Sequence, residues 1–226
     1  MYSTVHSGSC APASRPILDR IGSSLATLLQ RFWLVGLLLL AACAPMQVKQ
    51  HPSTAADESA QQAREAVLSD RTHWSLAAHI GVSNERDSGS GELDWQQAGG
   101  TYTFTVRAPV TGKTWKLSGD KGHARLEGVE AKSLESDDAQ QLLRERVGWD
   151  VPLASLRAWV LGLRAPAAPA RVSYADSGLP AKIEQSGWSV EYRDWFTDRN
   201  PPLPKRVFAT RGATRVKMAI ETWALE

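Results

Sequence analysis

The sequence predicts a mainly β domain with inserted helices (α+β), in which an antiparallel sheet curls around the helices. Apolar and polar residues alternate in several short segments between residues 73 and 127, and again after residue 170. Between these two groups, from residue 136 to 164, the apolar residues fall at helical spacing instead. A parallel sheet would need a helix between successive strands, and that pattern does not occur here. The order of strands, helices and strands therefore favours one curled antiparallel sheet.

The first group of strands is clearest at residues 101–109, TYTFTVRAP. Tyr102, Phe104 and Val106 alternate with threonines, which gives this strand one apolar face and one hydroxyl face. The same alternation predicts strands at 73–82, 92–97 and 114–120, with a short one through Ala124 and Leu126. Beyond residue 170 it predicts strands at 171–176, 180–187, 188–196, 205–212 and 214–223.

Three helices are expected. Residues 57–69 are rich in helix-forming residues and contain no helix breaker. Ser136 is followed by two aspartates, which suits the N-cap and first turn of a helix that ends at Gly148. Pro152 suits the first position of a third helix, ending at Gly162 or Arg164. Residues 165–170, APAAPA, then form a stiff linker.

The N-terminal segment has the pattern of a secretory signal. Between Arg31 and Cys43 lie eleven residues without charge, which is short of the roughly 20 that a membrane-spanning helix needs. Residues 40–43, LAAC, resemble the bacterial lipobox, in which the cysteine receives a diacylglyceryl group and becomes the new N-terminus. The prediction is a signal peptide at 1–42, a lipidated tether at 43–56 and one domain at 57–226. An ordinary signal with a chance cysteine is the alternative, and translation could start after Met1.

Two features of the mature chain follow from this division. Cys10 is lost with the signal and Cys43 carries lipid, so no thiol remains for a disulfide or a metal site. Ala44 follows the lipidated cysteine; the absence of Asp there resembles lipoproteins destined for the outer membrane. The whole chain has a net charge of +2, and residues 1–42 account for it, so a basic nucleic-acid-binding surface is not expected.

Residues 112–114, Gly-Lys-Thr, match the end of a nucleotide-binding P-loop. That motif needs another glycine five positions earlier, where this chain has Arg107, and a helix directly afterwards. The residues that follow alternate as a strand does. We therefore interpret 109–113 as the loop of a β-hairpin, with Gly112 supplying a positive φ.

The sequence shows no catalytic constellation. The five histidines lack metal-ligand spacing, and no G-x-S-x-G frame surrounds Ser90. We therefore expect a protein that is not an enzyme and uses no metal or cofactor. An envelope hydrolase is a less favoured alternative.

The nine tryptophans are the unusual feature of the composition, and eight of them follow Cys43. Large aromatic residues on apolar faces usually fill an ordinary core. They are also compatible with a half-barrel that is too wide for its own side chains and keeps a cavity for an apolar ligand. The residue pattern leaves both possibilities open.

Three segments, with the lipobox, resemble the LolB family of outer-membrane lipoprotein receptors of the Lol pathway. They are 95–117 (WQQAGGTYTFTVRAPVTGKTWKL), 151–163 (VPLASLRAWVLGL) and 215–225 (RVKMAIETWAL). The resemblance implies an open antiparallel β half-barrel with a helical lid over an apolar cavity. It also implies a lipid-anchored monomer on the periplasmic face of the outer membrane. Such a receptor takes acylated lipoproteins from the periplasmic carrier LolA and passes them into the inner leaflet, beside the outer-membrane phospholipid. A structural or assembly lipoprotein without a ligand cavity is the alternative.

The resemblance also indicates site residues. In the family, a hairpin loop after a proline carries an exposed apolar residue, usually Leu, that places the cargo in the membrane. The matching residues are Pro109, Val110 and Thr111, although Val is smaller than Leu and the family often has Gly where Thr111 stands. We expect the acyl-chain cavity to be lined by apolar residues from two strands and two helices: Tyr102, Phe104, Val106, Trp115, Leu117, Leu142, Leu156, Trp159 and Val160.

Overall fold

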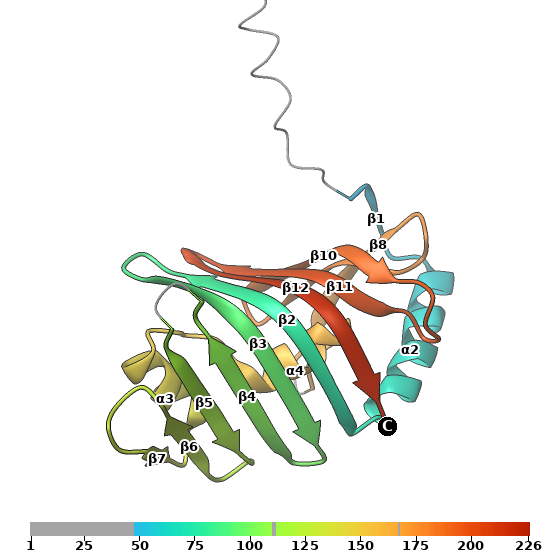
Figure 1. Ribbon diagram of the computed structural model, residues 1–226. Coiled ribbons are helices and arrows are strands. Elements are labelled where there is room, and N and C mark those ends of the chain that lie inside the picture. Colours follow the sequence, from blue (N-terminus) through green and yellow to red (C-terminus); the bar gives the residue numbers. More distant parts are fainter. Residues whose placement is uncertain (1–47, 110–111, 167) are drawn as a thin grey trace, which may run out of the picture. The chain divides into compact units, whose positions relative to one another are not determined.

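The computed structural model describes residues 48–109, 112–166 and 168–226, which belong to one compact unit (Figure 1). The strands in these ranges join a single 12-stranded sheet. Those of the first half are β1 (Gln50–Pro52), β2 (His73–Ser83), β3 (Ser88–Ala98), β4 (Thr101–Arg107), β5 (Thr114–Gly119), β6 (Ala124–Glu127) and β7 (Leu134–Ser136). Those of the second half are β8 (Ala170–Ala175), β9 (Pro180–Gln185), β10 (Trp188–Phe196), β11 (Leu203–Arg211) and β12 (Thr214–Leu225). The helices in the described ranges are α2 (Ala55–Ser69), α3 (Ala139–Arg146) and α4 (Leu153–Val160).

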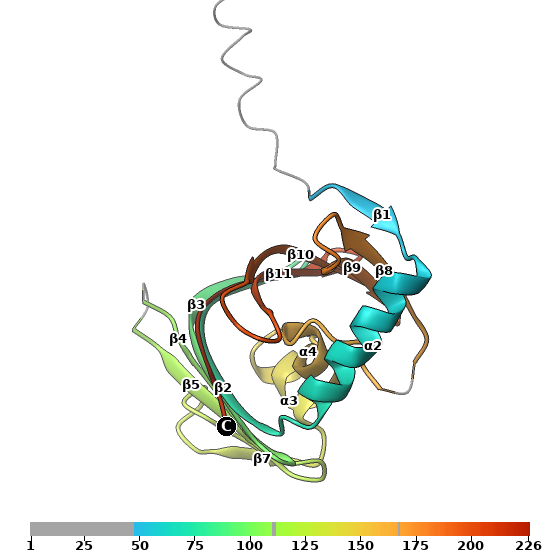
Figure 2. The ribbon, with the colours of Figure 1, turned by 90° about the vertical axis from the view of Figure 1, so that its right-hand side faces the viewer.

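The sheet is antiparallel throughout and open at both edges. Its order is β1-β8-β9-β10-β11-β12-β2-β3-β4-β5-β6-β7, so β1 and β7 form the edges and β12 joins the two halves. Figure 2 shows the sheet curling around α2, α3 and α4, which lie on its concave side. The predicted α+β fold, an open antiparallel half-barrel with inserted helices, is thus confirmed.

The alternation in the sequence decides which side chains face the helices. On β2, every second residue from Trp74 to Val82 is buried, and the residues between them are more exposed. The registers align inward-facing residues of neighbouring strands into rows that cross the sheet. In one such row, Leu76 on β2 pairs with Trp95, Trp95 with Phe104, and Phe104 with Leu117. The core therefore lies between these rows and the helices.

The ends of the elements differ from the prediction at several places. Ser136 belongs to β7 and pairs with Ala124, so the cap of α3 is Asp138, whose carboxylate accepts from the backbone N–H of Gln141. Pro152 is the N-cap of α4 and not its first helical residue. A strand was not expected at β1, which lies within the predicted tether 43–56 and pairs with β8.

The long helix α2 begins at Ala55 with a capping box. The side chain of Thr54 accepts from the backbone of Asp57, and the Asp57 carboxylate accepts from the backbone of Thr54. The face of α2 turned to the protein buries Gln61, Arg64 and Leu68, so two of its three buried side chains are polar. Among the residues described, no helix is both long and apolar enough to cross a membrane.

Candidate functional site

The structure brings the nine predicted cavity residues together on the concave side of the sheet. Seven of them are fully buried in the main core, and the other two, Tyr102 and Trp115, are partly buried and pack against it. The two strands β4 and β5 contribute five of the nine, and α3 and α4 contribute the rest. Whether these side chains line a cavity for a ligand remains a prediction.

Aromatic rings pack against one another across five strands of this inner face. The ring of Trp74 lies 5.6 Å from that of Trp223 and 5.2 Å from that of Trp95, measured between centroids. The chain of rings continues from Trp95 to Phe104 at 5.3 Å and from Phe104 to Trp115 at 5.8 Å. It ends at Trp149, beyond α3, at 5.1 Å from Trp115. The interior is therefore closely packed in this conformation.

Two surface pockets of about 470 Å³ and 480 Å³ lie away from this interior. One is lined by residues around β8 and the start of α2, and the other by the hairpins β9–β10 and β11–β12. Neither includes any of the nine predicted lining residues. Neither of these two pockets thus offers space for an acyl chain under the helices.

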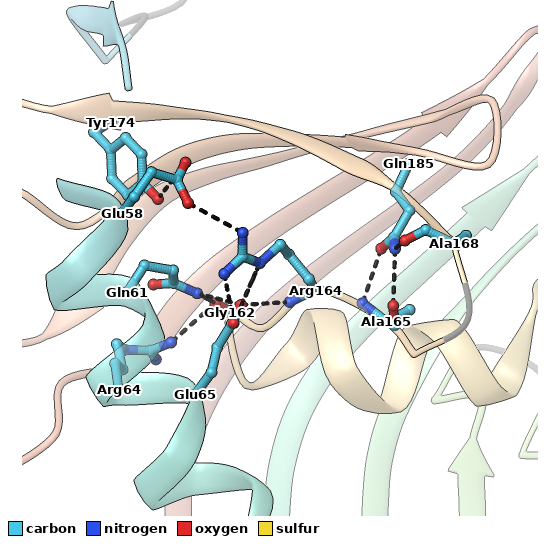
Figure 3. Close-up of polar contacts among 10 residues, drawn as sticks. All are labelled: Glu58, Gln61, Arg64, Glu65, Gly162, Arg164, Ala165, Ala168, Tyr174 and Gln185. Carbon is cyan, nitrogen blue, oxygen red and sulfur yellow. Dashed lines mark hydrogen bonds and ion pairs between the residues drawn. The ribbon is translucent and has the colours of Figure 1, made fainter. Parts of the chain in front are cut away.

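The helix α4 is fixed to the sheet by hydrogen bonds at its buried face. The indole Nε1 of Trp159 donates to Oε1 of Gln185 on β9 at 3.1 Å, and the hydroxyl of Tyr192 on β10 donates to the carbonyl of Trp159 at 2.9 Å. Gln185 also bonds the backbone of Ala165 and Ala168 after the helix (Figure 3). Burial raises the pKa of Tyr192, so its hydroxyl keeps its proton and remains a donor.

The helix α2 is held against the end of α4 by polar contacts. The guanidinium of Arg64 donates to the carbonyls of Leu161, Gly162 and Pro202. The amide of Gln61 donates to the carbonyl of Gly162 as well, and Figure 3 shows both contacts at Gly162. Burial lowers the pKa of Arg64 to about 10, which still leaves the side chain charged at neutral pH. We call these contacts, together with those of Arg164 below, the α2 latch.

Arg164 completes the α2 latch from the other side. It forms a bidentate ion pair with Glu65, with Nε–Oε1 at 2.9 Å and Nη2–Oε2 at 2.7 Å. Its Nη1 also donates to Oε2 of Glu58 at 3.1 Å. The hydroxyl of Tyr174 on β8 also donates to Glu58, at 3.4 Å. Burial alone would raise the pKa of Glu65, but the hydrogen bonds from Arg164 and Gln61 outweigh it and hold that pKa below its ordinary value.

Gly162 makes the α2 latch possible. Its φ is +73°, a conformation that side chains rarely adopt, and a Cβ there would lie 2.6 Å from Cη2 of Trp195. The guanidinium of Arg64 stacks on the same Trp195 ring, 4.9 Å from its centroid. Only a glycine lets the backbone carbonyl, the guanidinium and the indole approach one another this closely.

Strands β4 and β5 form an antiparallel hairpin, as predicted, and Pro109, Gly112 and Lys113 lie between them. The backbone N–H of Ala108 donates to the carbonyl of Lys113, and Gly112 has a φ of +65°. Pro109 is exposed. Val110 and Thr111 lie outside the described residues, as do Cys43 and the predicted signal peptide, so their proposed roles stay predictions.

Sequence reasoning missed the α2 latch. The signal that was available is the spacing of Gln61, Arg64 and Leu68, which places two polar residues on the same helical face as a leucine. Their acceptors lie about a hundred positions later, and nothing in the sequence pairs them. In the described ranges, no group of three or more His, Cys, Asp or Glu side chains is arranged to hold a metal ion.

A family model described as "Outer membrane lipoprotein LolB" matches residues 72–223, which is more than half of the chain. The chain belongs to the LolB family. An outer-membrane lipoprotein LolB of Xanthomonas axonopodis pv. citri is 37% identical over 183 residues, covering 79% of this chain and 84% of the relative. The LolB of Xanthomonas campestris pv. campestris strain 8004 is 39% identical over 176 residues, covering 74% and 81%.

A solved structure extends this likeness beyond LolB. The crystal structure of a LolA superfamily protein, NE2245 from Nitrosomonas europaea, matches with a TM-score of 0.50 and 8% sequence identity. The match covers 75% of this chain and 93% of that protein. At that identity the likeness concerns the fold alone.

Proposed function

We propose that this protein is an outer-membrane lipoprotein receptor. It accepts lipoproteins from the periplasmic carrier LolA and inserts them into the inner leaflet of the outer membrane. Membership in the LolB family carries this proposal, because relatives 37–39% identical over most of the chain bear the name outer-membrane lipoprotein LolB. No bond is made or broken in this transfer, and no cofactor is required.

The acyl chains of the cargo would bind between the sheet and the helices. The nine predicted lining residues lie there on four elements, and their side chains offer apolar surface without a charged group. Removing apolar surface from water is favourable by about 25 cal/mol per Å². A saturated acyl chain exposed to water would therefore gain a large free energy by entering this space.

The entry of a chain requires the packed interior to open, and the α2 latch is suited to control that step. Its contacts to the end of α4 are hydrogen bonds and ion pairs, which water can replace as they separate. The sheet, by contrast, is held by continuous ladders between neighbouring strands. We therefore infer that α2 moves away from α4 while the sheet, with α4 bonded to it, stays fixed.

The last step is delivery to the bilayer. Acyl chains on Cys43 would hold the protein at the outer membrane, since two or more chains anchor stably where one does not. The hairpin loop with Pro109, Val110 and Thr111 would contact the lipid and provide the exit. Transfer then runs from carrier to receptor to membrane because each site removes more apolar surface from water, and no energy source is needed.

Two experiments test the proposal. A purified lipoprotein bound to LolA is mixed with this protein, and movement of the lipoprotein to the receptor is followed by affinity separation. Depletion of the protein in its host should leave outer-membrane lipoproteins bound to the carrier. Normal delivery after depletion, or no transfer between purified components, would refute the receptor function.

A structural or assembly lipoprotein without a ligand cavity is the second candidate. The observation that favours it is the close packing of aromatic rings in the interior, from Trp223 to Trp149. A bound fatty acid detected by native mass spectrometry, or an increase in the fluorescence of a dye that reports apolar cavities, separates the two candidates. A permanently filled core binds neither.

A further inference from the structure

Three buried hydrogen-bond donors on the inner face of the sheet have no acceptor among the described residues. They are the indole Nε1–H groups of Trp74 on β2 and Trp95 on β3, and the hydroxyl of Tyr102 on β4. Trp74 and Trp95 are each only 3% exposed. Burial raises the pKa of Tyr102, and the charge of Asp120 raises it further, so the hydroxyl keeps its proton at neutral pH.

The strand registers place the three donors side by side. Trp74 pairs with Gln97, and Gln97 pairs on its other side with Tyr102. Trp95 lies two residues before Gln97 on the same face of β3, and its ring centroid is 5.2 Å from that of Trp74. The amide of Gln97 donates to the hairpin carbonyls at Gly99 and Thr101. The donors thus form one group where β2 and β4 begin.

Two other buried tryptophans of the core do have acceptors. Trp159 donates to Gln185, and Trp223 donates to the carbonyl of Pro204 at 3.0 Å. Trp188 is also unpaired, but it lies on β10, beside Trp159, and is not part of the group. A buried donor without an acceptor costs about 1–3 kcal/mol, and native proteins leave few such groups. Three such groups in two adjacent rows of the sheet indicate an acceptor that the described residues do not supply.

We propose that Trp74, Trp95 and Tyr102 bind the carbonyl oxygens of ester-linked fatty acyl chains. The inference rests on the proposed function, because it assigns a site within the same interior. A carbonyl is the one strong acceptor that a fatty acyl ester brings into an apolar space. The glyceryl end of the cargo would then lie at these donors. The methylene chains would lie against Phe104 and Leu117 in the next row and run along β4 toward the Pro109 hairpin.

A comparison of ester with ether tests this site. The mature protein is titrated with a lipopeptide whose cysteine carries a glyceryl group with two palmitoyl chains in ester linkage. It is also titrated with the counterpart in which both chains are ether-linked to the glyceryl group. We expect the ester form to bind about tenfold more tightly, the ratio that about 1.4 kcal/mol gives. The variant with Trp74→Phe, Trp95→Phe and Tyr102→Phe should bind both forms equally. Trp223→Phe, which removes an indole that already has an acceptor, should keep the tenfold ratio.

Nuclear magnetic resonance of the unsubstituted protein gives a measurement that does not depend on how the variants fold. The indole ¹⁵N–¹H signals of Trp74 and Trp95, assigned by single Phe substitutions, should move downfield with the ester lipopeptide and not with the ether. Equal affinities together with equal shifts would refute the ester site and leave acyl-chain binding intact. If neither lipopeptide bound, the proposed function itself would fail.

Diester and diether forms of phosphatidylethanolamine, used in the same titration, identify the source of the ester. A preference for the diester form there assigns the site to glyceryl esters in general, including membrane phospholipid. A preference confined to the lipopeptide assigns it to the cargo.

Discussion

The guanidinium of Arg64 on α2 donates a 2.6 Å hydrogen bond to the carbonyl of Leu161, immediately after α4. A charged side chain on α2 thus satisfies backbone carbonyls that directly follow α4, the carbonyl of Leu161 lying 97 positions later in the chain. No carboxylate hydrogen-bonds to this guanidinium among the described residues. Its charge is stabilised by backbone carbonyls and by the ring of Trp195.

Arg64→Met should destabilise the protein and open its interior. The substitution leaves buried carbonyls at Leu161, Gly162 and Pro202 without this donor, which should lower the free energy of unfolding by about 3 kcal/mol. It should also speed the uptake of an apolar dye. Chemical denaturation and dye-binding kinetics measure the two effects. Arg215→Met, on an exposed position of β12, is the control, and equal behaviour of the two variants would contradict the latch.

Gly162→Ala should lower the stability of the protein more than Gly178→Ala, although the two glycines have nearly the same φ. Gly178 has a φ of +75° and no atom within 4 Å of the place where a Cβ would lie, so Gly178→Ala shows only the backbone strain, about 1 kcal/mol. At Gly162 the new methyl group would also meet Trp195 at 2.6 Å, and we expect a loss of roughly 3 kcal/mol in total. Thermal unfolding of both variants measures the difference. Equal losses would show that Trp195 moves aside freely.

Glu65→Gln should make the stability of the protein less sensitive to acid. Because the folded-state pKa of Glu65 lies below its ordinary value, its ion pair with Arg164 stabilises the protein above the unfolded pKa, 4.5. That stabilisation is lost as the pH falls through the folded pKa. The midpoint of thermal unfolding should therefore fall less between about pH 7 and about pH 3 in the variant than in the unsubstituted protein.

The effect of Glu65 should be modest, since the pair is partly exposed and solvent screens it. Glu92→Gln, at an exposed position of β3, is the matched control and should keep the acid sensitivity of the unsubstituted protein. An identical pH profile for Glu65→Gln would show that the ion pair adds nothing to folding.

Val110→Glu should separate uptake from delivery. A charge at position 110 would oppose the proposed contact with lipid, whereas the interior that is proposed to hold the acyl chains is unchanged. The variant should therefore accept a lipoprotein from LolA and fail to pass it to liposomes. Val129→Glu, at an exposed valine after β6, is the control. Unchanged transfer by the first variant would remove Val110 from the mechanism.

Most of the sheet could be predicted from the sequence because each of the longer strands carries its own alternation of apolar and polar residues. The alternation at Tyr102, Phe104 and Val106 is enough to define β4 and its buried face. Short elements were missed for the same reason: β1 and β7 have three residues each, too few to show a period. The cap at Ser136 was misplaced because strand pairing, a contact with β6, keeps that residue extended.

The candidate site was predicted in its apolar part only. The spacing of apolar residues indicates which of them are buried, and the nine selected residues do lie in the core or pack against it. That they line an acyl-chain cavity stays a prediction. The α2 latch and the unpaired donors depend on which atoms meet after folding. Arginine is usually a surface residue, so the sequence does not indicate that Arg64 is buried. The sequence also does not distinguish the indole N–H of Trp95, which has no acceptor, from that of Trp223, which has one.

The position of β12 also governs the order in which the chain can fold. Val216 on the last strand pairs with Val82 on β2, and β12 pairs on its other side with β11. Without the residues from Thr214 onward, no strand joins β11 to β2, and the sheet is divided into two halves. Contacts between residues so distant in sequence form slowly, because closing the long intervening loop costs entropy. The nascent polypeptide is therefore exposed to aggregation until synthesis and export of its final strand are complete.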